Sequence, residues 1–485
     1  MSIPKIIHQI WIGPSKSPTK FMDTWKNIHE KEGFEYIRWT EEELYKRKFT
    51  PTLIDKINEM EEINGKADIL RWELLYEYGG FFVDADAYCL QSVKELVEKY
   101  NSFVCYENEI IRGKNWAPPG MYDDVLPEYP LLATGTMAFP PKHELPRLAI
   151  EWIKNNDISV VKTNKRAWRT VGPGLLTKIY WTNKWKKFHI LPSYLFLPIH
   201  ASGQTYIGHR KIYANQEWGS TKKSYEIMNT LEVPDILNTP EKSISILLPC
   251  YNINANFFKK TLDSILDQQF NIFINLICIN DGSNDLCTKL LKKLLEQFEK
   301  KSRWIKVHYY ENEKNIGIGP TLHKGVHYCP DEIIFRMDSD DIMTPNRLKL
   351  QYEFIENNDD CVLCGGQISF FKGNSLHPLI PPTKHKTITL DDYKNNTRHW
   401  IMNHPTFCFK KSKIIEVGNY NKDIREMCED FELELRVLKK YGVIHNIPEV
   451  IVYYRDSPGQ ITKKLKNSKS FWYNIRNKLI RDIIF

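Results

Sequence analysis

The chain has 485 residues, a formal net charge of +7 at pH 7 and 42% hydrophobic residues. This length exceeds one ordinary hydrophobic core, so the sequence predicts two domains or three. The small net charge and the globular composition exclude wholesale disorder and argue against a dedicated nucleic-acid-binding protein. No apolar run reaches about 20 residues and the N-terminal stretch lacks the pattern of a secretory signal, so we expect a cytoplasmic protein.

A helix, a glycine stop and a short strand are predicted in the first half of the chain, and two acids follow the strand. KADILRWELLYEY has helical periodicity, two glycines end it, and FFV runs into Asp84 and Asp86. In an extended segment, residues i and i+2 point the same way, so the two carboxylates can face one spot. At the edge of an α/β sheet such a pair makes an oxygen-ligand site for Mg²⁺ or Mn²⁺.

A composition change between residues 225 and 242 marks the predicted domain boundary. Pro, Asn and charged residues occur there without sustained periodicity, and the apolar strand SISILLP follows at once. Apolar strands then alternate with helical segments, which predicts a mostly parallel sheet covered on both faces. We therefore expect domains at 1–232 and 243–462.

The second half repeats the acidic pair. IIFRMDSDDIMTP, residues 333–345, places Asp338 and Asp340 after an apolar strand. A metal held there would offset the negative charge that develops on a departing diphosphate. A haloacid-dehalogenase phosphatase would require Thr or Val two residues after the pair, where this chain has Tyr88 and Ile342. An EF-hand loop would require a glycine and a closing glutamate that both segments lack.

The ten cysteines are scattered, and several lie in strand-like runs. This distribution is typical of reduced, buried thiols and not of a disulfide framework. The CxxC at residues 361–364 has no second pair, which favours a plain strand over a zinc site.

The final stretch, residues 463–485, predicts a basic amphipathic helix. Its apolar residues recur every four positions among lysines and arginines: Phe471, Ile475, Leu479 and Ile483. Two interpretations stay open, a terminal helix that docks on its own domain and peripheral attachment to an anionic membrane surface.

The first half resembles glycosyltransferase family 32, the DXD-containing sugar transferases, over most of residues 3–221. IPKIIHQIWIG, ADILRWELLYEYGGFFVDADAYCL and VGPGLL carry the resemblance, although Phe82 replaces a usual tyrosine. It implies a glycosyltransferase A-type fold, retention of anomeric configuration, and stacking of Trp11 on the donor base. It also implies that the nucleotide sugar and its metal are held by Asp68, Arg71, Asp84 and Asp86. Ser220, in NQEWGSTK, is implied as a metal-side ligand, although the flanking Asn215 and Thr221 depart from the family pattern.

The second half resembles glycosyltransferase family 2 from about Ser243 to Thr462. ILLPCYN, INDGSND, NIGIGPTLHKG, FRMDSDD, NHPTFCF and EMCEDFEL occur in the family's order. The resemblance implies that Asp281 accepts from the base and that Asp338 and Asp340 serve the metal and diphosphate. The loops implied to contact the nucleotide contain Pro249, Tyr251, Asn252, Asn315 and Gly317.

Inverting transfer requires one carboxylate that takes the proton of the acceptor hydroxyl as its oxygen attacks the anomeric carbon. The family resemblance assigns this role to Asp430, with the neighbouring Glu429 as the alternative. His404, in the NHP motif, is expected to line the acceptor or diphosphate side or to be structural.

Together these features predict a fold of the α/β class, with two tandem glycosyltransferase A-type, Rossmann-like, nucleotide-sugar-binding domains. We expect a bifunctional metal-dependent transferase that adds two sugars to a growing glycan, retaining at the first site and inverting at the second. The expected cofactors are Mn²⁺ or Mg²⁺ with UDP-sugars, and GDP-mannose is also allowed at the first site. The alternative is one active family 2-like transferase whose N-terminal half is a catalytically dead glycan-binding module. Nucleotidyltransferase activity is disfavoured because PCYNIN stands where those enzymes have a Gly-rich, Arg-containing loop.

Overall fold

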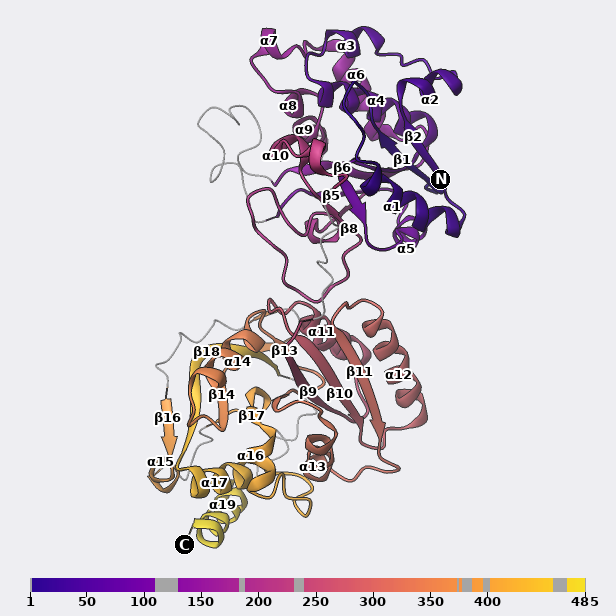
Figure 1. Cartoon of the computed structure of the whole chain (residues 1–485). Helices are drawn as coiled ribbons and strands as arrows, with labels where there is room; N and C mark the ends of the chain where they lie inside the picture. Colours follow the sequence, from indigo (N-terminus) through magenta and orange to yellow (C-terminus); the bar gives the residue numbers. More distant parts are fainter. Residues whose placement is uncertain are drawn as a thin grey trace. The chain divides into compact units, whose positions relative to one another are not determined.

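The computed structural model describes residues 2–109, 130–182, 188–230, 240–372, 375–376, 386–395, 402–456 and 469–484. These residues form two compact units, Met1–Tyr206 with Ile212–Ile236, and Ile207–Lys211 with Leu237–Phe485 (Figure 1). Part of the predicted boundary, residues 231–239, lies outside the described residues. Within the described ranges, no helix combines the length and the apolar character that a membrane span requires.

The first unit is built on a six-stranded mixed sheet with the order β2-β1-β3-β6-β5-β7. β1 pairs in parallel with β2 and β3, and β6 runs antiparallel to β3 and β5. The strands of this sheet are β1 (Ile6–Ile10), β2 (Glu35–Trp39), β3 (Gly80–Val83), β5 (Phe103–Tyr106), β6 (Leu132–Phe139) and β7 (His189–Leu191). β4 (Ala87–Cys89) pairs with β8 (Ala214–Gln216) as a separate ribbon. β3 is buried along its whole length, as expected of a strand covered on both faces.

Two hydrophobic clusters of this unit enclose the sheet. Residues of α4, α6 and α9 contribute to one cluster, and residues of α1 and α5 contribute to the other. The helices are α1 (Thr19–His29), α2 (Glu41–Lys46), α3 (Ile54–Glu59), α4 (Ile63–Tyr78), α5 (Lys94–Lys99), α6 (Glu144–Asn155), α7 (Val160–Thr163), α8 (Ala167–Thr170), α9 (Pro173–Thr182) and α10 (Gly219–Lys222). α4 ends at Tyr78, and Gly79 follows it with a φ of 64°, in the region that favours glycine, before the chain enters β3. The predicted sequence of helix, glycine stop and strand is therefore present.

The second unit has a ten-stranded sheet whose main path is β11-β10-β9-β12-β17-β14-β18-β13. β11, β10, β9 and β12 are parallel, while β17 is antiparallel to both β12 and β14. The strands are β9 (Ser243–Cys250), β10 (Phe273–Asn280), β11 (Ile305–Glu311), β12 (Ile333–Arg336), β13 (Ile342–Met343), β14 (Leu363–Lys372), β15 (Ser375–Leu376), β16 (Lys386–Thr389), β17 (Cys408–Lys410) and β18 (Val443–Arg455). Both units are therefore α/β, and each is built on a mixed sheet that contains parallel strand pairs.

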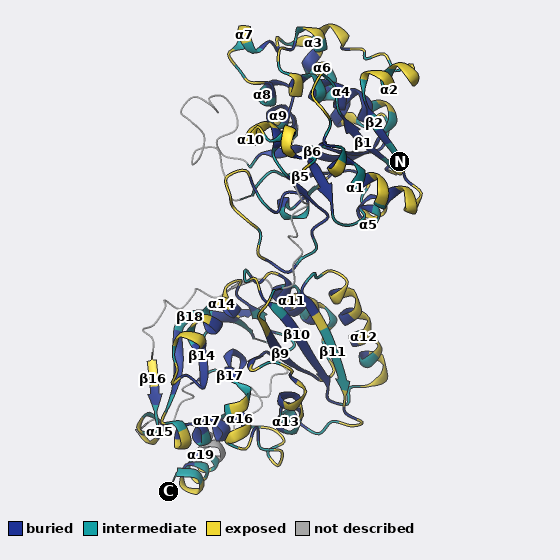
Figure 2. Cartoon of the chain, viewed as in Figure 1, coloured by how far each residue is buried: buried dark blue, intermediate teal, exposed yellow. Residues whose placement is uncertain are grey.

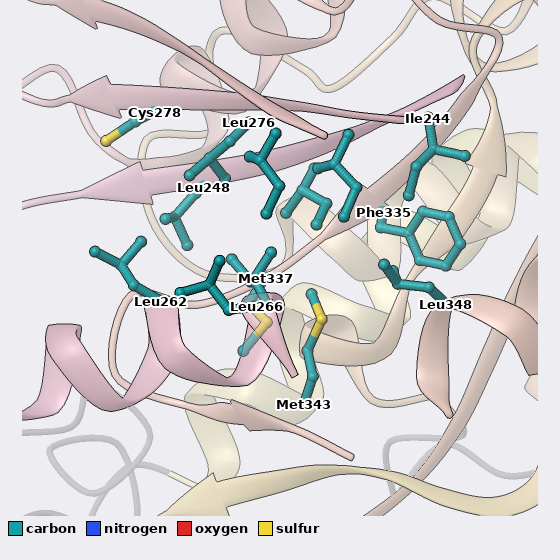
Figure 3. Close-up of a cluster of buried hydrophobic side chains, with 14 of the residues drawn as sticks. Ile244, Leu248, Leu262, Leu266, Leu276, Cys278, Phe335, Met337, Met343 and Leu348 are labelled. Atoms are coloured by element: carbon teal, nitrogen blue, oxygen red, sulfur yellow. The ribbon is translucent and has the colours of Figure 1, made fainter. Parts of the chain in front are cut away.

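Helices cover the second sheet and seal its core. They are α11 (Ala255–Leu266), α12 (Asp285–Glu299), α13 (Ile318–Tyr328), α14 (Arg347–Asn357), α15 (Leu390–Asn395), α16 (Lys411–Glu416), α17 (Glu429–Tyr441) and α19 (Lys469–Ile484). Leu248 of β9 and Leu262 of α11 meet Met337 and Met343 in the cluster between strands and helices (Figure 3). The central strands are buried and the outer face of α12 is exposed (Figure 2). This core fixes the ends of β9, β10 and β12, where the predicted site residues lie.

The C-terminal helix α19 packs against α17 of its own unit. Ile475, Leu479, Ile480 and Ile483 join the hydrophobic cluster that includes Phe431 of α17. The side chain of Phe471 lies outside the described residues. The apolar face of the predicted amphipathic helix is thus used in docking on its own domain, the first of the two interpretations of this segment.

Candidate active sites

The first site is centred on an arginine of α4 that joins two carboxylates. Arg71 lies 3.0 Å from Asp68 of the same helix and 2.7 Å from Asp84 at the end of β3. Its guanidinium also lies over the ring of Phe82, 4.2 Å from the centroid. Burial raises the pKa of Asp68 to about 6, and Arg71 only partly opposes this shift. The three predicted residues therefore form one charged group, in which Asp68 and Arg71 are buried and Asp84 is partly exposed.

Asp86 lies in the turn after β3, where the hydrogen bond from Ala87 N to Asp84 O closes the backbone. One carboxylate oxygen of Asp86 accepts from the side-chain amide of Gln216 at 2.6 Å, and the other accepts from Gly219 N at 2.6 Å. Gln216 also lies 3.4 Å from Asp84, so its amide bridges the pair. Burial, and then the charge of Asp84, raise the pKa of Asp86 to about 7. A turn, and not an extended strand, brings these two acids together.

Trp11 and Ser220 both contact Tyr225, which lies near the two acids. The rings of Trp11 and Tyr225 meet edge to face with centroids 5.1 Å apart, and Tyr225 is hydrogen-bonded with Ser220. Burial and the charges of Asp86 and Asp84 raise the pKa of Tyr225. The structure thus brings all six predicted residues of the first site into one neighbourhood.

Two glycines of the first unit lie against its acids. A Cβ on Gly135 of β6 would fall 2.5 Å from Asp84 Oδ2, and a Cβ on Gly172 would fall 2.6 Å from Asp68 Oδ2. Real Cβ atoms do not approach other atoms so closely, so either carboxylate would have to move if an alanine replaced the glycine. Because glycine has no side chain, these two positions leave the space that the carboxylates of Asp84 and Asp68 occupy.

In the second site, Asp281 follows β10 and fastens the loop before α13. Its Oδ1 accepts from Asn312 Nδ2 at 2.9 Å and from Ile316 N at 3.0 Å, and its Oδ2 accepts from Gly317 N at 3.0 Å. An ionised carboxylate has about four acceptor positions, so one on Oδ2 remains after these three bonds. Asp281 is thus a structural anchor of this loop as well as a predicted base-binding residue.

The predicted loop residues surround this anchor. Pro249 lies in β9 beside β10, and Tyr251, which follows it, is 53% exposed. Asn252 accepts from Asn284 N at 3.1 Å and donates its backbone N–H to Ser283, which joins the first loop to the INDGSND loop. Asn315 O accepts from the guanidinium of Arg425 at 3.0 Å. The Tyr251 ring is therefore exposed enough for an aromatic base to stack on it.

The second acidic pair follows β12 and lies beside an arginine that the sequence interpretation did not single out. Arg336, 4% exposed, makes two contacts with Asp338, at 2.6 Å and 2.8 Å. Burial, and then the charge of Asp338, raise the pKa of Asp340 to about 6. Arg455 donates to the backbone carbonyl of Asp340 at 2.7 Å and so fixes the turn that carries it.

At the start of α17 lie Glu429 and Asp430. Glu429 Oε1 is 3.5 Å from Nδ1 of His404, whose Nε2 is 3.0 Å from the Tyr420 hydroxyl. Burial and Asp430 raise the pKa of Glu429 to about 8, while burial, followed by Arg336, lowers the pKa of His404. Burial also raises the pKa of Asp430, and Arg336 opposes that shift. Arg336 therefore links the acidic pair electrostatically to the predicted base.

The donor sets of both sites fit a hard divalent cation. Each site offers two carboxylates close enough that one raises the pKa of the other, and a cation between them would relieve this repulsion. Within the described residues, no group of three or more His, Cys, Asp and Glu side chains is arranged to hold a metal. A cation at either site would therefore complete its coordination with other oxygen atoms, such as the Ser220 hydroxyl, phosphate or water.

The sequence interpretation missed three polar residues and one glycine of these sites. Gln216 and Tyr225 lie in segments with weak periodicity, and Tyr225 falls in the predicted boundary. Arg336 is the last residue of the apolar strand β12, and an arginine in an apolar run two residues before an acid was a usable signal. The close approach of Gly135 to Asp84 could not be identified without tertiary contacts.

Comparison with known proteins gives two family matches. Residues 245–418 match the model described as "Glycosyl transferase family 2". Residues 15–103 match "Glycosyltransferase sugar-binding region containing DXD motif". The matched segments include Asp68, Arg71 and both acidic pairs, whereas Glu429 and Asp430 lie beyond them.

Named relatives are also glycosyltransferases. The O-antigen biosynthesis glycosyltransferase WbnJ of Escherichia coli is 30% identical over 216 residues, 44% of this chain and 79% of that protein. The Escherichia coli enzyme described as UDP-Gal:alpha-D-GlcNAc-diphosphoundecaprenol beta-1,3-galactosyltransferase is 29% identical over 38% of this chain and 62% of its own length. The bifunctional glycosyltransferase pgtA of Dictyostelium discoideum is 34% identical over 25% of this chain and 15% of that protein.

Among solved structures, Staphylococcus aureus TarS 1–349 in complex with UDP covers 50% of this chain and 70% of its own, with 14% identity and a TM-score of 0.35. The family matches and the extent of the WbnJ match confirm both sequence resemblances. The chain belongs to glycosyltransferase family 2 through its C-terminal half and carries a DXD-containing glycosyltransferase sugar-binding region in its N-terminal half.

Proposed function

We propose that the protein is a bifunctional transferase with one nucleotide-sugar site in each unit, and that the two sites add two sugars to one growing glycan. The main support is that in each unit a buried strand is followed by two carboxylates whose charges repel each other. The first carboxylate of each pair forms an ion pair with a buried arginine. Linking two sites in one chain raises the effective concentration of the first product near the second site.

In the first site, Asp68, Arg71 and Asp84 would bind the ribose and diphosphate side of the donor, and Trp11 would stack on its base. The Trp11 ring meets Tyr225 at an interplanar angle of 75° and is only partly buried, so the exposed part of the indole would serve as the stacking surface. Transfer with retention of anomeric configuration is proposed here from the resemblance to family 32. UDP-sugars are the proposed donors, and GDP-mannose is included in the test.

In the second site, Tyr251 and the remaining acceptor position of Asp281 would bind the base of a UDP-sugar. Asp430 would take the proton from the acceptor hydroxyl while that oxygen forms the bond to the anomeric carbon and the bond to the diphosphate breaks, which inverts the configuration. Glu429, with a pKa of about 8, holds its own proton at neutral pH. Asp430 is therefore the better candidate for the base.

Mn²⁺ or Mg²⁺ would be held by Asp84, Asp86 and Ser220 in the first site and by Asp338 and Asp340 in the second. When bound, the cation would supply positive charge that stabilises the diphosphate as a leaving group. Arg71 and Arg336 hold the first acid of each pair, so both carboxylates keep their positions before the donor binds.

The test uses the whole chain and measures nucleotide release and sugar transfer from a panel of UDP-sugars and GDP-mannose, with and without Mn²⁺. Asp84→Asn is expected to abolish one activity and Asp340→Asn the other. Asp55→Asn and Asp359→Asn, at exposed positions of the two units, serve as controls that keep both. Loss of both activities in one variant would contradict independent sites. A single activity that only Asp340→Asn removes would identify the first unit as a dead binding module.

A further inference from the structure

The C-terminal helix α19 buries a charged residue although it is the last element of the chain. Arg476 is 4% exposed, whereas Lys478 and Arg481 of the same helix are exposed. Taking a guanidinium out of water costs several kcal/mol unless its charge is compensated. A terminal helix that needed only to cover an apolar surface could do so with Ile475, Leu479 and their neighbours.

Arg476 lies on the part of α17 that directly follows the predicted base. Its guanidinium is 4.4 Å from the centroid of the Phe431 ring, one residue after Asp430. Its strongest electrostatic partner is Glu434, one helical turn further along α17 than Asp430, and Asp430 is a weaker partner. Glu434 is 1% exposed and accepts a hydrogen bond from the Tyr393 hydroxyl. The arginine is thus part of a buried polar group on the base-carrying helix.

We propose that Arg476 is a positioning residue of the second site: its buried guanidinium, packed on Phe431 at the start of α17, supplies positive charge near Asp430 and so orients that carboxylate for proton abstraction. This inference rests on the proposed function of Asp430 as the base. The C-terminal helix would then be a working part of the transferase site, supplied from beyond the segment that matches the family model.

The charges around Asp430 show what the loss of Arg476 would do. Burial raises the pKa of Asp430, and two arginines, Arg336 from β12 and Arg476 from α19, lower it. The other titratable groups that face it are Glu429, Cys428 and Tyr420. Without Arg476, the pKa of Asp430 would be higher, so a larger fraction of this carboxylate would be protonated at a given pH. The acid limb of the pH profile of the second activity should therefore move to higher pH.

The experiment compares the pH profile of kcat/KM for the second activity in the whole chain and in Arg476→Met, with Arg481→Met as the matched control on the exposed face of α19. Arg476→Met is expected to move the acid limb to higher pH and to lose more activity in acid than in alkali. Arg476→Lys, which keeps the charge, should hold the limb near its original position at reduced kcat. Arg481→Met should match the unaltered protein.

Two outcomes would overturn the inference. One is a loss of activity in Arg476→Met that is uniform across pH, since that indicates a structural contact only. The other is an unchanged profile. If Arg476→Met fails to fold, as judged by circular dichroism, Arg476→Gln retains a polar side chain and is expected to show the same shift. Failure of the proposed function looks different: the unaltered protein would then transfer no sugar from any donor, or Asp430→Asn would remain fully active.

Discussion

Replacing Asp86 by asparagine tests whether the negative charge of this carboxylate lowers the stability of the folded first unit. Asp86 is 3% exposed and lies close enough to Asp84 for the two charges to repel. In the absence of a divalent cation, its ionised form is unfavourable in the folded protein. Asp86→Asn removes this charge and retains nearly the same side-chain shape. We therefore expect the variant to be more stable than the unaltered chain at alkaline pH.

The size and the pH window of the effect follow from the pKa of Asp86. A rise from 3.8 to about 7 corresponds to about 4 kcal/mol at alkaline pH, an upper bound on the gain. Asparagine loses one acceptor, but Gln216 can rotate its amide to accept from the new NH₂ group, so about 1 to 2 kcal/mol of hydrogen bonding is lost. The expected net gain is about 2 kcal/mol. Because the folded-state pKa is raised, the gain is absent below about pH 4, appears as pH rises, and is complete above about pH 7.

Urea unfolding of the whole chain in a metal chelator, followed at several pH values, measures this gain. A chain with two units need not unfold in one step. Asp340→Asn removes a carboxylate of the second unit whose pKa is raised to about 6. The unfolding transition that this substitution shifts therefore belongs to the second unit. Asp86→Asn should raise the midpoint of the first-unit transition at alkaline pH only. A midpoint that falls, or that rises equally in acid, would refute the assignment of strain to this carboxylate.

Two further predictions concern the geometry of the sites. Gly135→Ala would place a Cβ 2.5 Å from Asp84 Oδ2, so the carboxylate must move by about 1 Å to reach an ordinary van der Waals contact; transfer assays should show loss of the first activity and an unaffected second one. Glu429→Gln imitates the protonated side chain expected at neutral pH, so the second activity should persist, whereas Asp430→Asn should abolish it. The reverse result would make Glu429 the base.

The sequence predicted those features that depend on local pattern. Apolar runs located β3, β9, β10 and β12, and the positions of the acids at the ends of β3 and β12 followed from those strands. Gly79 stopped α4 because only a residue that tolerates positive φ can turn the chain there. Motif order then supplied the correct family for each half.

The features that sequence reasoning missed depend on residues far apart in the chain. Gln216 meets Asp86 across 130 positions, and no periodicity in a three-residue strand indicates such a contact. Asp281 was assigned only to the base, yet three of its hydrogen bonds hold a loop that begins about 30 residues later. Arg336 was missed because the apolar run that contains it was interpreted only as a strand leading to the acidic pair.

The same electrostatic arrangement occurs in both units. In each, a buried arginine pairs with the first acid, Arg71 with Asp84 and Arg336 with Asp338, while the second acid has a raised pKa. If both acids were paired with arginines, little attraction for a cation would remain. If neither were paired, the burial of two charges would destabilise the fold. On this reasoning, in both units the paired carboxylate limits the cost of burying charge, and the carboxylate with the raised pKa retains an attraction for positive charge.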